Sequence, residues 1–312
     1  MDSSELYYIK QQFVLGAYPA LTQVSVPDAS SADYIPTLVY KARAFLALNN
    51  PNSALELIPE DSDNVALRAV SALTKGEEGL EVLRDLCVEI EGEEFSQWEI
   101  EMVRVLAATA FMRAGEVEEA LETLNGAEDA GDESSAILSQ IYISLSRPSV
   151  AQKILTSALK VNPDSLVLQQ AEAVLALVTA AQGLGGEPYS TAISFYTEQL
   201  ANPSVSSAAL LVGRGVARIM RGDLSAARSD LEEAESILTR AQSKPGMGEV
   251  LAAMTVTAGL GSGKRGEADE LWSRLCSEHP SHPMVVDLSA KAELFDSCAA
   301  KFQLPPRAVT SA

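Results

Sequence analysis

The stretch SAILSQIYISLSRPSVAQKILTSALKVNPD, from Ser135 to Asp164, decides the expected fold, because its apolar residues follow the period of two short amphipathic helices. The first helix carries a small residue and an aromatic, and the second carries three small or aliphatic residues: Ser139, Tyr142, Ala151, Leu155 and Ala158. Small residues let two helix backbones approach closely, and the aromatic fills the gap between them. Pro163 ends the pair, because proline cannot donate a backbone hydrogen bond to a continuing helix. The stretch therefore predicts a helix hairpin.

This frame resembles the tetratricopeptide repeat of about 34 residues. Good further copies are anchored at Ala120, Ala227 and Ala268, and weaker ones at Ala54, Leu80 and Ala192. The step from anchor to anchor varies between about 26 and about 41 residues, so the repeat is ragged but recurrent. The predicted fold class is therefore all-α, a tetratricopeptide-like α-solenoid of helix hairpins. One solenoid domain is expected over residues 1–303, followed by a frayed tail over residues 304–312.

The ends of the predicted solenoid and one loop depart from the repeat. Ser281-His282-Pro283 begins a last helix on which Leu288, Phe295 and Phe302 lie seven residues apart. Terminal repeats need a cover for their exposed core, so we expect this helix to cap the array. Residues 182–189 (QGLGGEPY) form an inserted loop, which is interpreted as a plain connection or as a segment that touches a partner.

Composition limits the function classes that this chain can serve. Of its 312 residues 47% are apolar and 5% aromatic, and the formal net charge is −20 with an isoelectric point near 4.5. Such a surface repels phosphate backbones and anionic lipid, so nucleic acid and direct membrane adsorption are disfavoured. The simplest interpretation of the acidity is solubility.

The cysteines and the first residues indicate the compartment. Cys87, Cys276 and Cys298 lack the spacing of a disulfide framework, which favours a reducing environment. The opening MDSSELYY has no secretory pattern, and no apolar run is long enough to span a bilayer. We expect a cytoplasmic protein.

Two motifs invite a chemical interpretation, and the residues around them argue against it. Residues 261–266 spell G-x-G-x-x-G, but a predicted helix precedes them where a nucleotide site needs a strand, so a repeat turn is expected. Cys276, His279 and His282 lack a fourth zinc ligand, and nearby prolines separate them. The histidines are expected to lie at the end of one helix and the start of the next.

Acid–base or nucleophilic catalysis has no support in the pattern either. The carboxylates Glu116, Glu118, Glu119 and Glu122 share a helix with the apolar stripe Val117, Leu121 and Leu124, so a solvated helix face explains them. We therefore predict a protein that is not an enzyme, with no catalytic, cofactor-binding or metal-ligating residues.

A curved stack of hairpins offers the concave face lined by its first helices as a binding surface. Counting back from each repeat anchor gives ten candidate partner-binding residues, largely apolar rather than basic. They are Arg43, Leu46, Thr109, Met112, Arg113, Gln140, Ile143, Val216, Ile219 and Met220. Such a lining suits a folded protein segment better than a terminal carboxylate, although core packing is the alternative for each single residue.

Three segments carry a more specific resemblance. LYYIKQQFVLGAYPALTQ from Leu6, LLVGRGVARIMRGDLSAARSDLEEA from Leu210 and HPSHPMVVDLSAKAELFDSCAAKF from His279 are similar to the epsilon-subunit family of the COPI vesicle coat, or coatomer. They occur in the family's order, and the resemblance covers essentially the whole chain. The helix–Gly-x-Tyr start and the histidine–proline pairs before the last helix are its distinctive parts.

That resemblance implies a structural subunit of the coat that forms transport vesicles between the Golgi and the endoplasmic reticulum. It further implies that the chain binds and stabilises the C-terminal domain of the coatomer alpha subunit, as a heterodimer within a larger complex. The chain would then meet the cytosolic face of Golgi membranes and COPI-coated vesicles only through the assembled coat, with no cofactor. The alternative is another cytosolic tetratricopeptide-repeat scaffold or adaptor.

Overall fold

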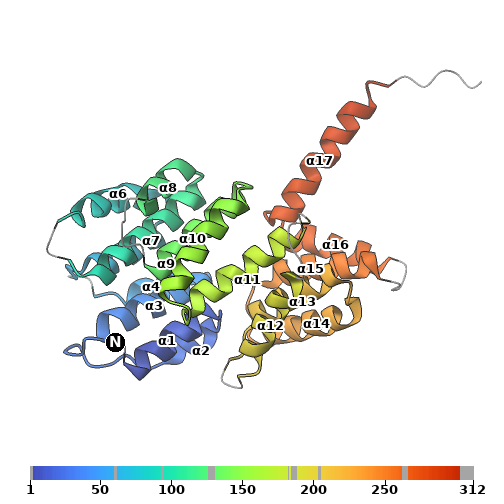
Figure 1. The fold of residues 1–312 in the computed structure, drawn as a ribbon. Helices are drawn as coiled ribbons and strands as arrows, with labels where there is room; N and C mark the ends of the chain where they lie inside the picture. Colours follow the sequence, from blue (N-terminus) through green and yellow to red (C-terminus); the bar gives the residue numbers. More distant parts are fainter. Residues whose placement is uncertain are drawn as a thin grey trace, which may run out of the picture. The chain divides into compact units, whose positions relative to one another are not determined.

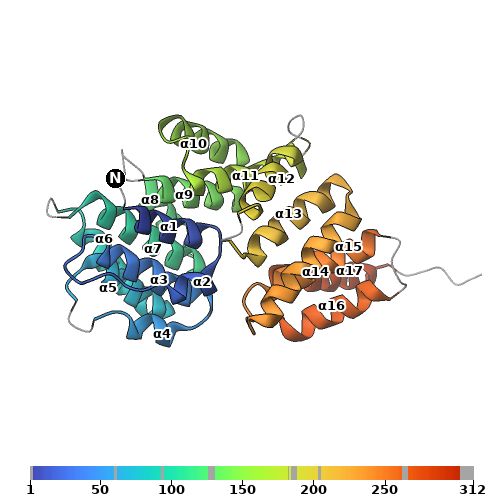
Figure 2. The same ribbon diagram turned by 90° about the horizontal axis from the view of Figure 1, so that it is seen from below.

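The computed structural model describes most of the chain, and each described element is helical (Figures 1 and 2). The described residues are 3–59, 62–92, 95–125, 131–181, 183, 188–202, 205–261 and 266–302. The α-helices are α1 (Ser4–Val14), α2 (Tyr18–Gln23), α3 (Tyr34–Ala47), α4 (Pro51–Glu56), α5 (Val65–Thr74), α6 (Leu80–Glu89), α7 (Gln97–Ala114), α8 (Val117–Asn125), α9 (Asp132–Ser144), α10 (Pro148–Val161), α11 (Leu166–Ala181), α12 (Pro188–Leu200), α13 (Ala208–Arg221), α14 (Leu224–Arg240), α15 (Met247–Leu260), α16 (Glu267–Glu278) and α17 (Pro283–Ala299), and one 3-10 helix, η1 (Gly76–Gly79), precedes α6.

The helices pair into successive hairpins, which confirms the all-α, tetratricopeptide-like solenoid. From α3 to α16 each odd-numbered helix packs against the even-numbered helix that follows it, and the first helices α3, α5, α7, α9 and α11 also pack in a row. The chain divides into two compact units, Met1–Pro245 and Gly246–Ala312. The single domain expected over residues 1–303 stays a prediction. Within the described ranges, no helix combines the length and apolarity that a bilayer-spanning segment needs.

The hairpin that decided the fold is formed by α9 and α10. Ser139 and Ala151 are fully buried and Leu155 nearly so, which places the small residues of the repeat frame at the helix contact. Pro148 opens α10, where a missing backbone N–H costs little. Helix α9 begins at Asp132, three residues before the stretch that predicted it.

Side-chain caps mark the start of several helices. Ser3 caps α1, and Ser96 forms a reciprocal capping box with Glu99 at the start of α7. At the start of α5 the Asn64 side chain, and not that of the preceding Asp63, accepts the hydrogen bonds from the first turn. His282 caps α17, its Nδ1 accepting from the Met284 N–H, so the structural interpretation of this histidine is confirmed.

The first unit closes on itself through the turn between α1 and α2. Leu15, 1% exposed, belongs to an apolar cluster with Ala173 of α11, Tyr196 of α12 and Leu210 of α13. Gly16 has a left-handed φ of +72°, and an added Cβ would come within 3.2 Å of the Ala209 Cβ. Glycine therefore fits this position for two reasons: its backbone adopts a positive φ readily, and it has no side chain to clash with Ala209. The start of the chain thus packs against helices almost 200 residues later.

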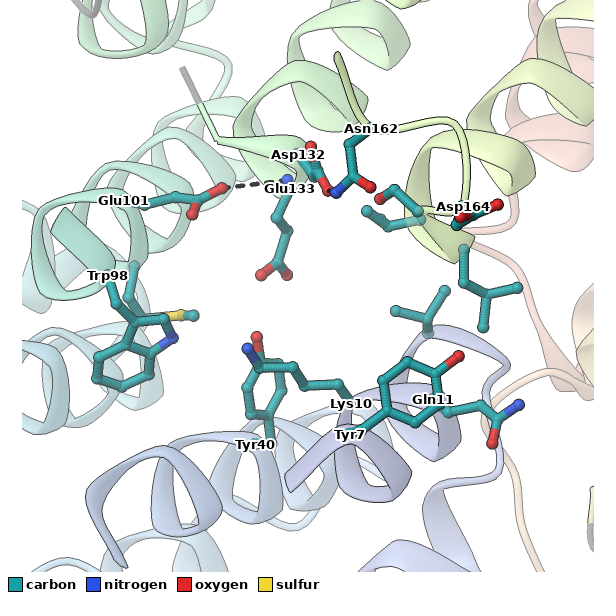
Figure 3. Close-up of a pocket in the computed structure, with 15 residues that line it drawn as sticks. Tyr7, Lys10, Gln11, Tyr40, Trp98, Glu101, Asp132, Glu133, Asn162 and Asp164 are labelled. Carbon is teal, nitrogen blue, oxygen red and sulfur yellow. Dashed lines mark hydrogen bonds between the residues drawn. The ribbon is translucent and has the colours of Figure 1, made fainter. Parts of the chain in front are cut away.

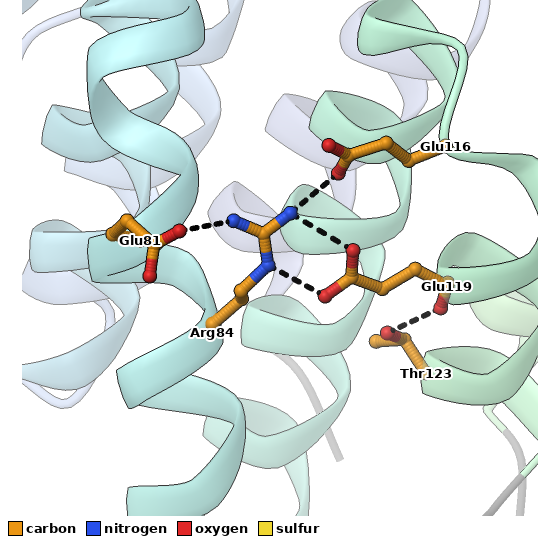
Figure 4. Close-up of polar contacts among 5 residues, drawn as sticks. All are labelled: Glu81, Arg84, Glu116, Glu119 and Thr123. Atoms are coloured by element: carbon orange, nitrogen blue, oxygen red, sulfur yellow. Dashed lines mark hydrogen bonds and ion pairs between the residues drawn. The ribbon is translucent and has the colours of Figure 1, made fainter.

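A four-residue ion-pair network joins the second helices α6 and α8 (Figure 4). The Arg84 guanidinium donates to Glu81 at 2.6 Å, to Glu116 at 2.6 Å and to Glu119 at 2.7 Å. The hydrogen bond from Arg84 holds the pKa of the Glu119 carboxyl below its usual range. Glu116 and Glu119 are therefore occupied in linking neighbouring repeats, whereas Glu118 and Glu122 are exposed as expected.

The last helix forms where it was expected, but it does not pack as a cap. Only Val285 of α17 is buried, while Leu288, Phe295 and Phe302 are 41%, 71% and 81% exposed. The physical reason is the distribution of apolar residues, which point in several directions around α17 rather than along one stripe. A spacing of seven residues alone gave too little information to predict burial.

Two of the sequence motifs, and the tail, lie largely outside the described residues. Residues 262–265 are not described, but helix α15 leads into Gly261 and Gly266 precedes α16 with a φ of +95°, so the motif connects two helices. The prediction that a helix rather than a strand precedes this motif is confirmed. Most of the loop 182–189 and the tail 304–312 also lie outside the described residues.

Candidate functional site

A cavity of about 530 Å³ lies inside the first unit, between α1 and the N-terminal ends of α7, α9 and α11 (Figure 3). Side chains of α1 line one side of it, and side chains of α7, α9 and the α10–α11 link line the other. The lining includes Tyr7, Lys10 and Gln11 from α1, Tyr40 from α3, Trp98, Glu101 and Met102 from α7, Asp132 and Glu133 from α9, and Asn162 and Asp164 from the link. Four carboxylates and three aromatic rings therefore face a single space.

A buried ion pair lies beside this cavity, with Glu133 in the lining and Arg43 behind it. The Arg43 guanidinium binds both carboxylate oxygens of Glu133, and their side chains are 9% and 17% exposed. The same guanidinium lies 4.3 Å from the ring centroid of Phe13 and 5.3 Å from that of Tyr40, in cation–π geometry. Burial by itself would lower the pKa of Arg43, but the attraction to Glu133 outweighs burial and raises that pKa. Arg43 thus ties α1, α3 and α9 together.

Glu101 supports the start of α9 from the neighbouring repeat. Its Oε1 accepts the backbone N–H groups of Glu133 at 3.1 Å and Ser134 at 3.3 Å. Burial raises the pKa of the Glu101 carboxyl, which the hydrogen bonds from the two N–H groups oppose and the nearby Glu133 charge reinforces. A side chain on Gly131 would collide with this carboxylate, so the close approach requires glycine. This carboxylate therefore acts as the cap that α9 does not supply from its own first residues.

Trp98 and Tyr40 leave a polar edge facing the cavity. The indole Nε1 of Trp98 is buried and has no hydrogen-bond acceptor in good geometry, although it lies close enough to the Tyr40 hydroxyl to oppose the rise in the Tyr40 pKa. Tyr40 is 6% exposed with its hydroxyl directed into the cavity (Figure 3), and burial raises its pKa above the usual value. An unsatisfied buried donor costs about 1–3 kcal/mol. The Trp98 N–H is therefore a hydrogen-bond donor that a bound acceptor could satisfy.

The ten predicted partner-binding residues occupy first helices, but they are not gathered at one point. Arg113 and Gln140 are exposed, and Thr109, Ile143, Val216, Ile219 and Met220 are half-buried. Leu46 and Met112 pack against the large apolar core of the early repeats, and Ile143, Val216 and Met220 border two smaller cores. Arg43 is turned inward to Glu133, so its charge serves the fold.

The cavity itself was missed by the sequence interpretation. Counting from repeat anchors selects the C-terminal halves of the first helices, whereas Trp98 and Glu133 lie in first turns and Glu101 lies just after the first turn of α7. An acidic residue in a first turn, such as Glu133, normally indicates stabilisation of its own helix, so it gave no sign of a cavity. No local signal showed that α1 would cover these turns and enclose them.

The described side chains offer no metal site, since no group of three or more His, Cys, Asp or Glu residues there is arranged to hold an ion. In the fold, Cys276 and His279 lie at the end of α16, and His282 begins α17.

Comparison with solved structures indicates the same architecture. A tetratricopeptide repeat protein from Parabacteroides merdae superimposes with a TM-score of 0.53 at 18% identity, over 80% of this chain and 95% of the other. A chain of the APC/C hetero-tetramer Cut9–Hcn1 gives a TM-score of 0.58 at 15% identity, over 91% of this chain and 53% of the other. At these identities the likeness concerns the fold alone.

Comparison at the level of sequence is more specific. A relative described as a probable coatomer subunit epsilon, from Schizosaccharomyces pombe, is 26% identical over 305 residues and covers 96% of each chain. The profile of the coatomer epsilon subunit family matches residues 2–303, which is nearly the full length. Such membership indicates a structural role in a multi-subunit coat. The solenoid, its order of segments and this match lead to one conclusion: the chain belongs to the coatomer epsilon subunit family.

Proposed function

We propose that this chain binds the C-terminal domain of the coatomer alpha subunit and stabilises it within the COPI coat. The observation that carries the proposal is the family match over residues 2–303, supported by a helical array of the kind that grips other polypeptides. The chain then works at the cytosolic face of Golgi membranes and of vesicles that travel between the Golgi and the endoplasmic reticulum. Its membrane association runs through the assembled coat.

The proposed contact surface is the first-helix stripe, defined as six of the ten predicted residues, two exposed and four half-buried: Arg113, Gln140, Ile143, Val216, Ile219 and Met220. This stripe combines aliphatic and thioether side chains with two polar ones. Thioethers and aliphatic side chains adapt to an irregular apolar partner. The remaining four predicted residues are left out of the stripe because they have other contacts: Leu46 and Met112 pack against the apolar core, Arg43 pairs with Glu133, and the Thr109 hydroxyl donates to the Val105 carbonyl.

Co-expression with a fragment that holds the C-terminal domain of the alpha subunit, followed by affinity pulldown, tests the proposal. The double variant Ile143→Glu/Ile219→Glu places a charge on α9 and on α13, and it should abolish the pulldown because buried carboxylates without partners oppose association. A matched control, Gln152→Glu/Ser229→Glu, adds the same charge to exposed positions of the second helices α10 and α14 and should bind like the parent.

Circular dichroism of each purified variant separates lost binding from lost folding. The proposal predicts unchanged helicity in both double variants and loss of binding only in the stripe variant. Undiminished binding by the folded stripe variant would exclude the stripe as the contact surface. Failure of the parent chain to capture the alpha-subunit fragment would exclude the partner.

A further inference from the structure

We propose that the cavity under α1 receives one basic side chain, an arginine or a lysine, from an extended segment of the partner subunit. The inference deepens the proposed function, on which it rests for the identity of the partner. It adds a specific pocket, defined by Tyr40, Trp98, Glu101, Glu133 and Asp164, to a surface that is otherwise mainly apolar. We call these five residues the cation pocket.

Charge gives the first argument. The cavity lining carries the carboxylates of Glu101, Asp132, Glu133 and Asp164 against a single cation, Lys10. Including Arg43, which pairs with Glu133 from behind, the formal balance is four negative charges against two positive ones. A second anion would meet repulsion here, whereas a cation finds an excess of negative charge in a partly enclosed space where screening is weak.

Aromatic rings give the second argument. Tyr7, Tyr40 and Trp98 line the same cavity, from α1, α3 and α7. A guanidinium or ammonium group held near such rings gains about 0.5–2 kcal/mol from their quadrupoles, and more as it loses water. The carboxylates alone would attract any cation, whatever the shape of its side chain. The combination with rings favours a side chain with a cationic head and an apolar stem, which is the construction of arginine and lysine.

The indole N–H of Trp98 gives the third argument, because it is buried without an acceptor. Neither arginine nor lysine has an acceptor on its side chain, but the backbone carbonyl next to it does. An extended segment therefore satisfies the pocket with one residue, the cation turned to the carboxylates and the carbonyl to Trp98. An apolar side chain would desolvate the carboxylates without adding a counter-charge, and it would give the indole N–H no acceptor.

The size of the cavity limits what enters it. A volume of about 530 Å³ lies within the range of roughly 300–1,000 Å³ that small-ligand pockets occupy. It takes a long side chain with a short piece of backbone, whereas a helix or a folded domain has to remain outside. Since α1 covers the early first helices, the partner meets this part of the unit through a single inserted residue.

Fluorescence of Trp98 tests the pocket without the partner. The chain has two tryptophans, so Trp272→Phe leaves Trp98 as the sole reporter. The probe is N-acetyl-arginine amide, and its neutral analogue N-acetyl-citrulline amide has nearly the same shape. We expect a saturable change in emission with the arginine probe and at least a tenfold weaker response with citrulline. Equal responses to both would overturn the proposal.

A matched pair of charge variants locates the effect. Asp164→Asn removes one pocket charge at an exposed link, and Asp85→Asn removes one charge from α6 outside the pocket. Arginine binding should weaken several-fold in the first and stay unchanged in the second. An equal loss in both variants would mean that net charge attracts the probe, and the pocket assignment would fall.

The assembled pair supplies a second test that separates the two proposals. Each arginine and lysine of the alpha-subunit fragment is changed to glutamine, and its affinity is measured against the parent chain and Asp164→Asn. At one basic position of the fragment, the change to glutamine should weaken its affinity for the parent chain about tenfold. The same change should weaken its affinity for the Asp164→Asn variant much less, because the two residues are energetically coupled. If the fragment binds but no basic position couples, the pocket fails and the proposed function stands. If the fragment does not bind, the proposed function fails and the Trp98 titration still decides the pocket.

Discussion

The chain has an apolar helix near each end, and the two are used differently. Helix α1 directs Leu6, Ile9 and Phe13 to one side, buries the first two, and is held by the Arg43–Glu133 pair behind Phe13. Helix α17 buries only Val285 and leaves Phe295 71% exposed. The contrast shows that apolar residues in a helix do not ensure its burial. A helix is buried when its apolar residues form a single stripe and a complementary surface covers that stripe.

The largest effect in this comparison is expected from removing the carboxylate that anchors α1. Glu133→Ala leaves the Arg43 charge buried without its partner, and losing one member of a buried pair costs about 3–5 kcal/mol. Urea unfolding followed by circular dichroism measures the change. The double variant Arg43→Met/Glu133→Leu should recover most of the loss, since apolar replacements of both partners need no counter-charge. A Glu133→Ala variant as stable as the parent would contradict the idea that this ion pair holds α1 in place.

The next effect tests the closure of the first unit. Leu15→Ala should cost about 3 kcal/mol, because it empties a site that is 1% exposed among side chains of α11, α12 and α13. The same urea titration applies, together with amide hydrogen exchange in α1. A loss below about 1 kcal/mol would mean that the turn after α1 closes the unit only loosely.

A smaller effect is expected from the matching change in α17. Phe295→Ala should alter stability by no more than about 0.5 kcal/mol, as exposed substitutions usually do, although it removes a larger side chain than Leu15→Ala. Thermal unfolding of the isolated chain measures it. A clear destabilisation would show that α17 packs against its own chain in solution.

The smallest change is a rate of thiol labelling, which sharpens the contrast without altering stability. Cys298 on α17 is exposed, whereas burial raises the pKa of the Cys87 thiol on α6 to about 11. Since only the thiolate reacts, iodoacetamide at pH 8 should modify Cys298 well before Cys87, as peptide mass mapping would show.

The pH dependence of Cys87 follows from the direction of its shift. A thiol whose pKa is higher in the folded state favours folding fully below its unfolded pKa and loses that contribution as pH rises toward 11. Labelling of Cys87 should therefore speed up with each step in pH, and faster labelling of Cys87 than of Cys298 at pH 8 would contradict its burial.

The fold was largely predictable because its signals are local. The small residues at Ser139 and Ala151 and the proline at Pro163 each act within a few residues, and each was found where expected. Helix caps are equally local: Ser96 caps α7, and at α5 Asn64 rather than Asp63 accepts the first-turn N–H groups, since neighbouring polar residues compete for them.

The cavity and the packing of the ends could not be predicted in this way. Glu101 meets Glu133 from 32 residues away, Arg43 meets Glu133 from 90, and Leu15 contacts residues almost 200 positions later. Such contacts depend on how the hairpins curve, and the ragged repeat spacing sets that curvature. The first-helix stripe was deduced from ideal repeat geometry, so it stays a proposal.

The closure at Leu15 and Gly16 has a consequence for the order of events on the ribosome. At a synthesis rate of about 5–20 residues per second, α1 is synthesised roughly 10–40 s before the start of α13. During that interval its apolar side cannot reach its final neighbours, although α3 and its own hairpin partner become available early. Nascent chains of this protein therefore complete the first unit only late in translation.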